Sequence, residues 1–304
     1  MPSISNKIIA WGLAYFFCVY LPQSVVRPAW PWIVSSFGPT WWELLYRGNI
    51  LINIASILIL NICLFPMYRY HVFDGLRCDS SKPWPWRSDD KDVRDTFWKS
   101  FRGSLFLVPF NAFVVAYAAL YLTSPLALYI GAFSIESSGF PSTKELFCHL
   151  AVALVVEDTM FYFTHRGLHE YLYKSIHSWH HEYTSVIALS SEHAHPVEFA
   201  LGNLLPVITG PLLMRSHMFT LWAFVFLRVV VSHDEHCGFN LPWSPVRILP
   251  FGSSANAHAW HHRYFDGMYA SQFSFWDSIF ATDKGFKVWE SKQRAQKVGL
   301  GKRK

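Results

Sequence analysis

Long apolar segments separated by polar loops dominate the pattern of residues along the chain. A helix that crosses a bilayer needs about 20 predominantly apolar residues. The segments that approach this length are Ile8–Val25, Asn49–Met67, Ser104–Leu122 and Glu145–Phe163. Backbone polar groups inside a membrane must be satisfied within each segment, so we expect helices. The pattern predicts an all-α integral membrane protein with about four transmembrane helices.

Three other apolar segments differ from these four. Pro125–Phe133 is too short to cross a bilayer and predicts a bend or a re-entrant piece. Pro196–Leu213 and Met218–Val231 are separated and interrupted by proline, glycine and polar residues, and they predict a hairpin that enters the membrane and returns to the same side. The N-terminal apolar segment could also be a secretory signal. However, no small-residue cleavage site follows it, so we interpret it as a retained anchor.

The loops predict how the chain is oriented in the membrane. Cytoplasmic loops carry an excess of Lys and Arg. The loop with this excess contains Arg69, Arg77, Lys82, Arg87, Lys91, Arg94, Lys99 and Arg102. If that loop is cytosolic, four crossings place both termini and everything after Phe163 in the cytosol. The resulting expectation is that all histidine-rich segments lie on the cytosolic side.

The composition supports a membrane protein and excludes other classes. Charged residues make up 15% of the 304 positions, whereas about a quarter is usual in soluble domains. Hydrophobic residues make up 52% and aromatic residues 18%, which excludes a disordered chain. The formal net charge of +5 does not suggest a nucleic-acid-binding protein. The five cysteines have no CxxC spacing, which argues against a disulfide framework and against a cysteine zinc site.

Histidines carry the candidate chemistry. The chain has 15 of them, most between Glu145 and Arg263. HRGLH places His165 and His169 one turn apart on one helix face. The runs HSWHH and HAWHH repeat a spacing of three and four residues, which on a helix also shares one face. Their members are His177, His180 and His181 in the first run and His258, His261 and His262 in the second.

These three runs predict a metal site. Neutral imidazole is the commonest nitrogen ligand of zinc, copper and iron. Three or four ligands suffice for one zinc ion, and the runs together supply eight histidines, so we expect two metal ions. A nearly all-histidine site for two metals beside a membrane favours iron and oxygen chemistry. A histidine-rich metal transporter or sensor is the alternative from a different class, although it predicts histidines spread along the membrane segments.

Four segments resemble the membrane-bound sterol desaturase/fatty acid hydroxylase superfamily. They are EDTMFYFTHRGLHEYLYKSIHSWHHEY, EHAHPVE, DEHCGFNLPWSPVRILPFG and AHAWHHRYFDGMYASQFSFWDSIFATD, within Glu157 to Asp283. Within the superfamily they are most similar to C-4 methylsterol monooxygenases and next to cholesterol 25-hydroxylases. The resemblance implies iron ligands at His165, His169, His177, His180, His181, His195, His236, His258, His261 and His262.

The resemblance also implies the activity and its partners. It implies a di-iron, O2-dependent monooxygenase of the endoplasmic reticulum membrane that oxidises the C-4 methyl group of a sterol stepwise. Zinc could replace iron on purification. Electrons would come from NADPH or NADH through a reductase, commonly with cytochrome b5, and neither GxGxxG nor a P-loop occurs in the chain. The alternatives within the superfamily are a sterol side-chain 25-hydroxylase, a sterol desaturase and a fatty acid hydroxylase.

Carboxylates near the histidines are candidate supporting residues. They are Glu157, Asp158, Asp234 and Glu235. Each could accept the free ring N–H of a ligating histidine, which fixes the tautomer of that ring, or could form an ordinary ion pair. For His193 and His233 a surface or supporting role is open. We expect one catalytic unit in three parts: membrane-anchoring helices and a basic loop in 1–144, the catalytic region in 145–283, and a basic cytosolic tail in 284–304.

Overall fold

The computed structural model describes residues 4–38, 40–245 and 252–301, and most of these residues lie in helices. No strand occurs among them; the β-pairings they contain are isolated bridges, Arg77 with Phe239 and Gly252 with Phe273. The all-α prediction is therefore confirmed. Residues 246–251, which belong to the segment NLPWSPVRILPFG, lie outside the described residues.

Five helical stretches are long and apolar enough to cross a membrane: Ile4–Phe37, Trp41–Tyr70, Lys91–Tyr129, Thr143–Tyr171 and Pro196–Leu213. The first four contain the four predicted segments, and the fifth is the first arm of the predicted hairpin. The main helices within and after these stretches are α1 (Ile4–Tyr15), α2 (Arg27–Phe37), α4 (Asn49–Tyr70), α5 (Lys91–Phe110), α6 (Ala116–Tyr129), α7 (Thr143–Tyr171), α9 (Leu205–Leu213) and α10 (Met218–His236). The chain is a multi-pass membrane protein.

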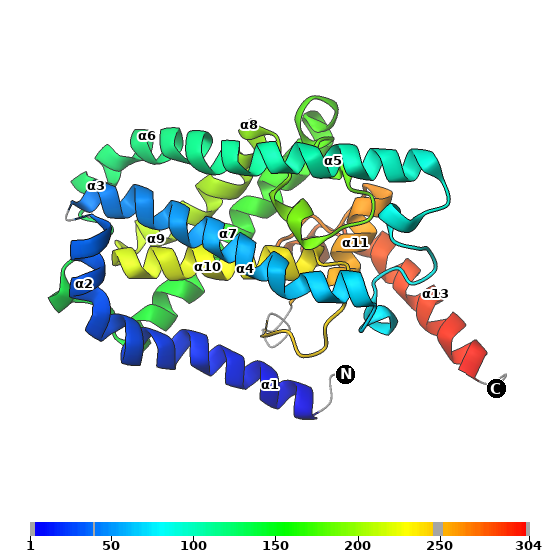
Figure 1. The fold of residues 1–304 in the computed structure, drawn as a ribbon, viewed down its shortest axis with the longest axis horizontal. Coiled ribbons are helices and arrows are strands. Elements are labelled where there is room, and N and C mark those ends of the chain that lie inside the picture. The colour runs from blue at the N-terminus through cyan, green and yellow to red at the C-terminus, as the bar shows by residue number, and fades with distance from the viewer. Residues whose placement is uncertain (1–3, 39, 246–251, 302–304) are drawn as a thin grey trace.

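Two prolines, Pro22 and Pro125, lie inside continuous helical segments. The predicted N-terminal anchor does not end at Val25 but continues through the π-helical segment Phe16–Val26 into α2, which runs across the end of the bundle in Figure 1. Pro125 lies inside α6, so the start of the segment predicted as a separate bend extends the preceding helix. The bend follows directly, where the N–H of Ala132 donates to the carbonyl of Ala127. Membrane helices tolerate such prolines because neighbouring groups satisfy the freed carbonyls.

Small residues let the central helices approach closely. A Cβ atom placed on Gly210 of α9 would lie 2.5 Å from the Cα of Ala153 in α7. Close backbone approach through small residues is how membrane helices gain packing energy without a hydrophobic driving force. Trp30 is fully buried beside them, and its Nε1–H donates to the carbonyl of Ile135 at 2.9 Å. Helices α2, α7, α9 and α10 thus share one core.

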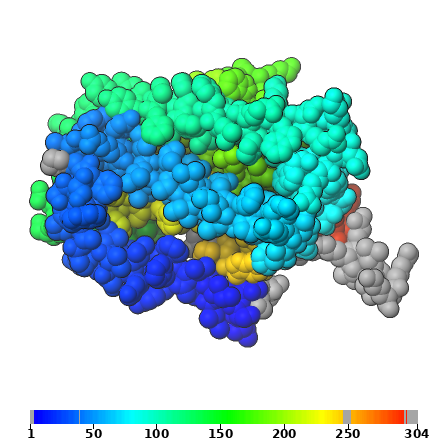
Figure 2. All heavy atoms as spheres, viewed as in Figure 1, coloured from blue at the N-terminus to red at the C-terminus, as the bar shows by residue number. Residues whose placement is uncertain are grey.

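The histidine-rich segments gather at one end of the bundle. In Figure 1, α11 (Ala255–Tyr264) and both chain ends lie toward the same end of the long axis. Figure 2 shows that helices from the first half of the chain cover most of this face of the molecule. The segment predicted as a basic tail forms α13 (Lys284–Gly301), and Phe286 is buried against Trp260 of α11. Its first turns are therefore docked on the histidine-bearing end.

Candidate metal centre

Nine histidines form two compact groups. The first contains His165, His169, His177, His181 and His261, and the second contains His180, His236, His258 and His262. Within each group one nitrogen per ring lies within 4.8 Å of the corresponding nitrogen of every other member. All nine rings are buried except that of His169, which is half-buried. The two groups are adjacent, because the rings of His181 and His262 have centroids 4.6 Å apart.

Both HxxHH runs contribute to both groups. His177 and His181 belong to the first group and His180 to the second, whereas His261 belongs to the first and His258 and His262 to the second. In α11 this division follows from the regular helix, since His258 and His262 lie one turn apart, whereas the adjacent side chains of His261 and His262 point about 100° apart around the axis. The first run departs from the expected regular α-helix. His177 ends a π-helical segment, Tyr173–His177, and His180 begins a 3₁₀ turn, His180–Glu182.

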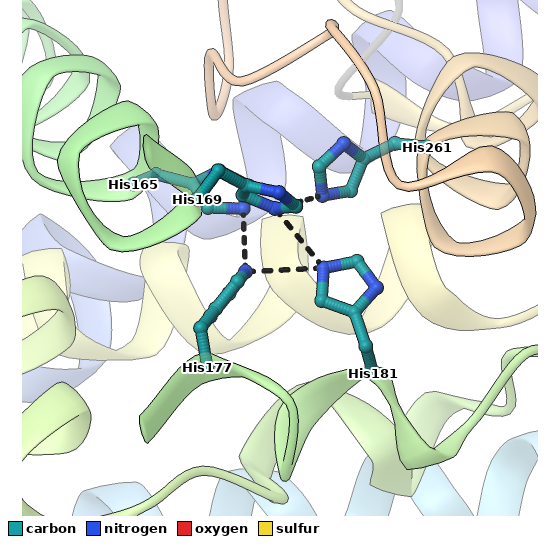
Figure 3. Close-up of side chains that lie close together, drawn as sticks. All are labelled: His165, His169, His177, His181 and His261. Carbon is teal, nitrogen blue, oxygen red and sulfur yellow. Dashed lines mark hydrogen bonds between the residues drawn. The ribbon is translucent and has the colours of Figure 1, made fainter. Parts of the chain in front are cut away.

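In the first group the Nε2 atoms converge on one point (Figure 3). The Nε2 atoms of His165 and His177 are 3.1 Å apart, and those of His169 and His261 are 3.2 Å apart. His181 links these two pairs, since its Nε2 lies 3.1 Å from the Nε2 atoms of both His169 and His177. Helix α7, two short segments after it and α11 each present one or two of these rings.

The second group has the same construction. The Nε2 atom of His236, at the end of α10, lies 2.8 Å from that of His258 and 3.3 Å from that of His262. The Nε2 atom of His180 lies 3.4 Å from that of His236. Two helices and a short 3₁₀ turn thus bring four imidazoles together.

The Nδ1 atoms, on the opposite side of each ring from the Nε2 atoms that converge, fix the orientation of the rings. Five rings donate their Nδ1–H to a backbone carbonyl, at 2.6–3.1 Å. The pairs of donor ring and accepting carbonyl are His165 and Tyr269, His180 and His193, His236 and Ser232, His261 and Gly267, and His262 and Tyr183. A carbonyl only accepts hydrogen bonds, so each of these rings carries its hydrogen on Nδ1 and a lone pair on Nε2. Bonds of this type set the tautomer of metal-ligating histidines.

This donor set fits a metal cation. In the second group, three Nε2 lone pairs, those of His180, His236 and His262, face one another at 3.3–3.4 Å. A protonated ring would relieve the repulsion, but burial, and then neighbouring histidines, lowers the pKa of His262, and burial lowers that of His180 to about 4. The rings are therefore neutral at physiological pH, and a shared cation is the arrangement that satisfies their lone pairs.

His195 lies outside both groups, although the resemblance implied that it is a ligand. Its Nδ1 accepts the N–H of Val197 and so caps the short helix Pro196–Glu198. Its ring packs on Trp179 at 4.6 Å between centroids. Its Nδ1 thus serves as a helix cap, which is a common task for a polar side chain at this position, and the ring joins neither group.

His193 and His233 are buried beside the two groups but belong to neither. The His193 ring contacts Ser104 at 2.9 Å and Glu182 at 3.3 Å, and its carbonyl accepts the hydrogen bond from His180. The His233 ring contacts Ser191 at 3.2 Å and Asn61 at 3.1 Å. Both rings therefore support the structure around the groups through polar neighbours.

The candidate carboxylates make contacts other than the expected ones. Asp158 accepts the backbone N–H groups of Gln272 and Phe273 at 2.8 and 2.9 Å, and so holds the loop after α11. Glu157 pairs with Arg228 at 3.1 Å. The partners of both carboxylates are thus groups other than ring N–H donors, and Glu157 forms the ion pair that was the alternative. A buried carboxylate in an apolar helix needs such partners, because an unpaired charge there is costly.

Asp234 and Glu235 were also expected to support ligand rings. Asp234 uses its carbonyl to accept from the Cys237 thiol, and buried Glu235 lines the cavity below the two groups. A residue that sequence reasoning missed, Glu198, supports a ring of the first group. Its Oε1 accepts the Nδ1–H of His177 at 2.8 Å. The segment EHAHPVE contains the signal that could have identified it, since Glu198 is an acidic residue three positions after His195.

A cavity begins directly beside both histidine groups. His165 and His177 of the first group and His180, His236 and His258 of the second form one end of it. Its wall also contains apolar residues, Leu204, Val207, Val225 and Val229, together with buried charged ones. A second, apolar cavity shares part of this wall and continues between α4, α6, α9 and α10, toward Leu120, Ile208 and Leu221. The arrangement can hold an elongated lipid with one end beside the metal ligands.

The fold and the site together define a multi-pass membrane protein with a histidine-rich centre suited to two metal ions. Residues 150–282 match the family model described as fatty acid hydroxylase. The chain belongs to this family.

Comparison with curated proteins gives relatives of two kinds. The chain is 29% identical to methylsterol monooxygenase 1 of Gallus gallus over 281 residues, which cover 92% of this chain and 90% of that protein. It is 41% identical to methylsterol monooxygenase 2-2 of Arabidopsis thaliana over 50% of this chain and 58% of the relative. It is 42% identical to a very-long-chain aldehyde decarbonylase of Oryza sativa over 44% of this chain and 51% of the relative. The last two alignments thus span little more than half of those proteins. No solved structure matches the chain.

Proposed function

We propose that this protein is a di-iron monooxygenase that uses O2 to oxidise the C-4 methyl group of 4-methylsterols stepwise, in sterol biosynthesis. The observation that carries the proposal is the pair of four- and five-histidine groups, whose members line one cavity together with apolar and buried polar residues. The names of the relatives from Gallus gallus and Arabidopsis thaliana support the sterol and the monooxygenase reaction.

The residues of this chain have defined tasks in that reaction. The nine grouped histidines would hold two irons, which, when bound, supply the O2 activation needed to oxidise an unactivated C–H bond. Glu198 and the backbone carbonyls around the site hold the rings in the ligating tautomer. The buried walls of the cavity exclude water from the reacting carbon and orient the lipid.

Electron supply and location complete the proposal. The chain carries no nucleotide fingerprint, so NAD(P)H-derived electrons would arrive through a reductase, cytochrome b5 or both. We place the protein in the endoplasmic reticulum membrane with the histidine groups and both termini in the cytosol, which is supported by the basic loop between the second and third apolar stretches. His169 and Lys174 line an opening at the surface next to the first group, where a donor would come close.

The test combines metal content with product analysis. The protein, purified in detergent, is assayed for iron and zinc and then incubated with a 4,4-dimethylsterol or cholesterol, together with O2, NADPH and a reductase. We expect about two irons per chain and a C-4 hydroxymethyl or carboxylate product. His180→Ala should lose both. The matched control is His149→Ala, since His149 contacts Ser216 and lies outside both groups.

The competing functions give different results in the same assay. A 25-hydroxylated product, a new double bond or a hydroxylated fatty acid would keep the chemistry and replace the substrate. Aldehyde consumption would move the protein toward its Oryza sativa relative. Bound metal with no lipid product would favour a transporter or sensor. The structure weighs against a transporter, because the grouped histidines are closed in two clusters at one end of the bundle rather than distributed along a path.

A further inference from the structure

Two buried groups inside the cavity have unused hydrogen-bonding capacity. Arg228 of α10 is 8% exposed and lines the cavity. Its Nη2 pairs with Glu157 Oε1 at 3.1 Å and donates to Ser271 Oγ at 2.5 Å, while its Nε and Nη1 have no hydrogen-bond partner. Glu157, 1% exposed and also in the cavity wall, has no partner for Oε2.

Such a pair is costly to leave unsatisfied. A buried donor or acceptor without a partner forfeits its hydration, and more so when it is charged. Ionisable residues inside a membrane bundle mark substrate positions for this reason. Because the unused atoms are donors on Arg228 and an acceptor on Glu157, the complementary ligand must both accept and donate. A hydroxyl group does this, whereas a ketone or an ether only accepts.

The position of the pair relates that hydroxyl to the reacting carbon. Arg228 precedes His236 by eight residues on α10, and Glu157 precedes His165 by eight on α7. Eight residues of α-helix span about 12 Å. The backbone positions of the pair therefore lie about two helical turns from those of the ligands, and all of these side chains line the same cavity.

We propose that Arg228 and Glu157 form a hydroxyl-binding subsite for the substrate in the wall of the cavity that both histidine groups line. The inference rests on the proposed function and adds a specificity determinant to it. The subsite selects a sterol that carries a free hydroxyl over one that carries a ketone or an ether at the same position.

The experiment measures sterol binding without turnover. Purified protein in detergent, with its metals and without reductant, is titrated with a tritiated 4,4-dimethylsterol that has a free 3-hydroxyl. Its 3-O-methyl ether and its 3-ketone are used as competitors. We expect the hydroxyl form to bind at least about tenfold more tightly than either analogue, because neither analogue has a donor for Oε2 of Glu157. Equal binding of the three ligands would overturn the subsite.

A charge-neutral double variant, Glu157→Gln with Arg228→Gln, should lose this preference. The control is Arg166→Gln with Glu170→Gln, which removes an ion pair on α7 outside the cavity wall. Retention of the preference in the folded double variant would overturn the proposal. If the double variant does not fold, Arg228→Lys keeps a charge for Glu157 but offers fewer fixed donors, and an unchanged preference there would also overturn it.

The same data separate this inference from the proposed function. Equal binding of the three sterols, together with a C-4 oxidation product, would remove only the subsite. No binding of any sterol would remove both the subsite and the sterol substrate.

Discussion

Replacing Glu198 tests whether the outward hydrogen bonds of the rings control metal binding. The Glu198 carboxylate accepts the Nδ1–H of His177 at 2.8 Å, and the side chains are 6% and 1% exposed. Glu198→Gln keeps the size of the side chain and an oxygen that can accept the hydrogen bond, but it removes the charge. Glu198→Ala removes the acceptor and leaves the imidazole N–H buried without a partner.

The expected losses follow from the strengths of these bonds. A hydrogen bond to a charged group contributes about 1.5–3 kcal/mol, and one between neutral groups about 0.5–1.5 kcal/mol. Glu198→Gln should therefore weaken metal binding by about 1.4 kcal/mol, which is roughly tenfold. Glu198→Ala should weaken it by up to about 3 kcal/mol, or roughly a hundredfold, within the range found for residues that support metal ligands.

The assay is competition for Fe(II) between the purified protein and a chromogenic chelator under anaerobic conditions. The matched control is Glu192→Gln, because Glu192 is a buried carboxylate in the wall of the same cavity whose Oε1 accepts from Ser191. We expect its iron affinity to match that of the wild type. If Glu198→Gln and Glu198→Ala also bind iron like the wild type, either His177 is not a ligand or its tautomer is set elsewhere.

Three further predictions concern packing, pH and the ligand set. Gly210→Val should lower the melting temperature in a detergent thermal scan, because its Cβ would lie 2.5 Å from the Cα of Ala153, and overpacking costs about 1–3 kcal/mol. Burial lowers the pKa of His217 from 6.5 to about 4, so the unfolded chain binds a proton in this window and the native chain does not. Stability should fall by about 1.4 kcal/mol per unit as the pH drops from 6.5 to 4, and His217→Asn should lessen this slope in denaturation curves. His195→Asn should leave the iron content unchanged in elemental analysis, whereas His181→Ala should reduce it.

Each of these predictions has a control or a contrary result. Gly12→Val is the control for Gly210→Val, since no atom lies within 4 Å of a Cβ at Gly12. An unchanged pH slope in His217→Asn would show that other groups cause the acid sensitivity. The asparagine keeps an acceptor for the helix cap that His217 Nδ1 provides to the N–H of Phe219. Loss of iron in His195→Asn would place this ring among the ligands, against the observed geometry.

Much of the fold could be predicted because membrane helices are set by local sequence. Apolar length alone located the four predicted spans, since each satisfies its own backbone hydrogen bonds. The bend from α1 into α2 and the docking of α13 could not be predicted in this way. Both depend on contacts with distant residues, such as the packing of Phe286 against Trp260.

The sequence by itself determined which residue type forms the site and roughly where. The spacing of HRGLH, HSWHH and HAWHH singled out eight of the nine grouped histidines, because helical periodicity brings such residues to one side. Family resemblance added His236 and also His195, which the structure leaves outside both groups.

Only the tertiary structure decided how those histidines divide and what supports them. His180 and its neighbour His181 enter different groups, as do His261 and His262 of α11, because each group is assembled from rings on several elements that pack together. Glu198 reaches His177, and Arg228 reaches Glu157, only when helices far apart in sequence pack together. Periodicity is a local property that positions side chains on one element, whereas the partners of a buried polar group are chosen by the packing of several elements.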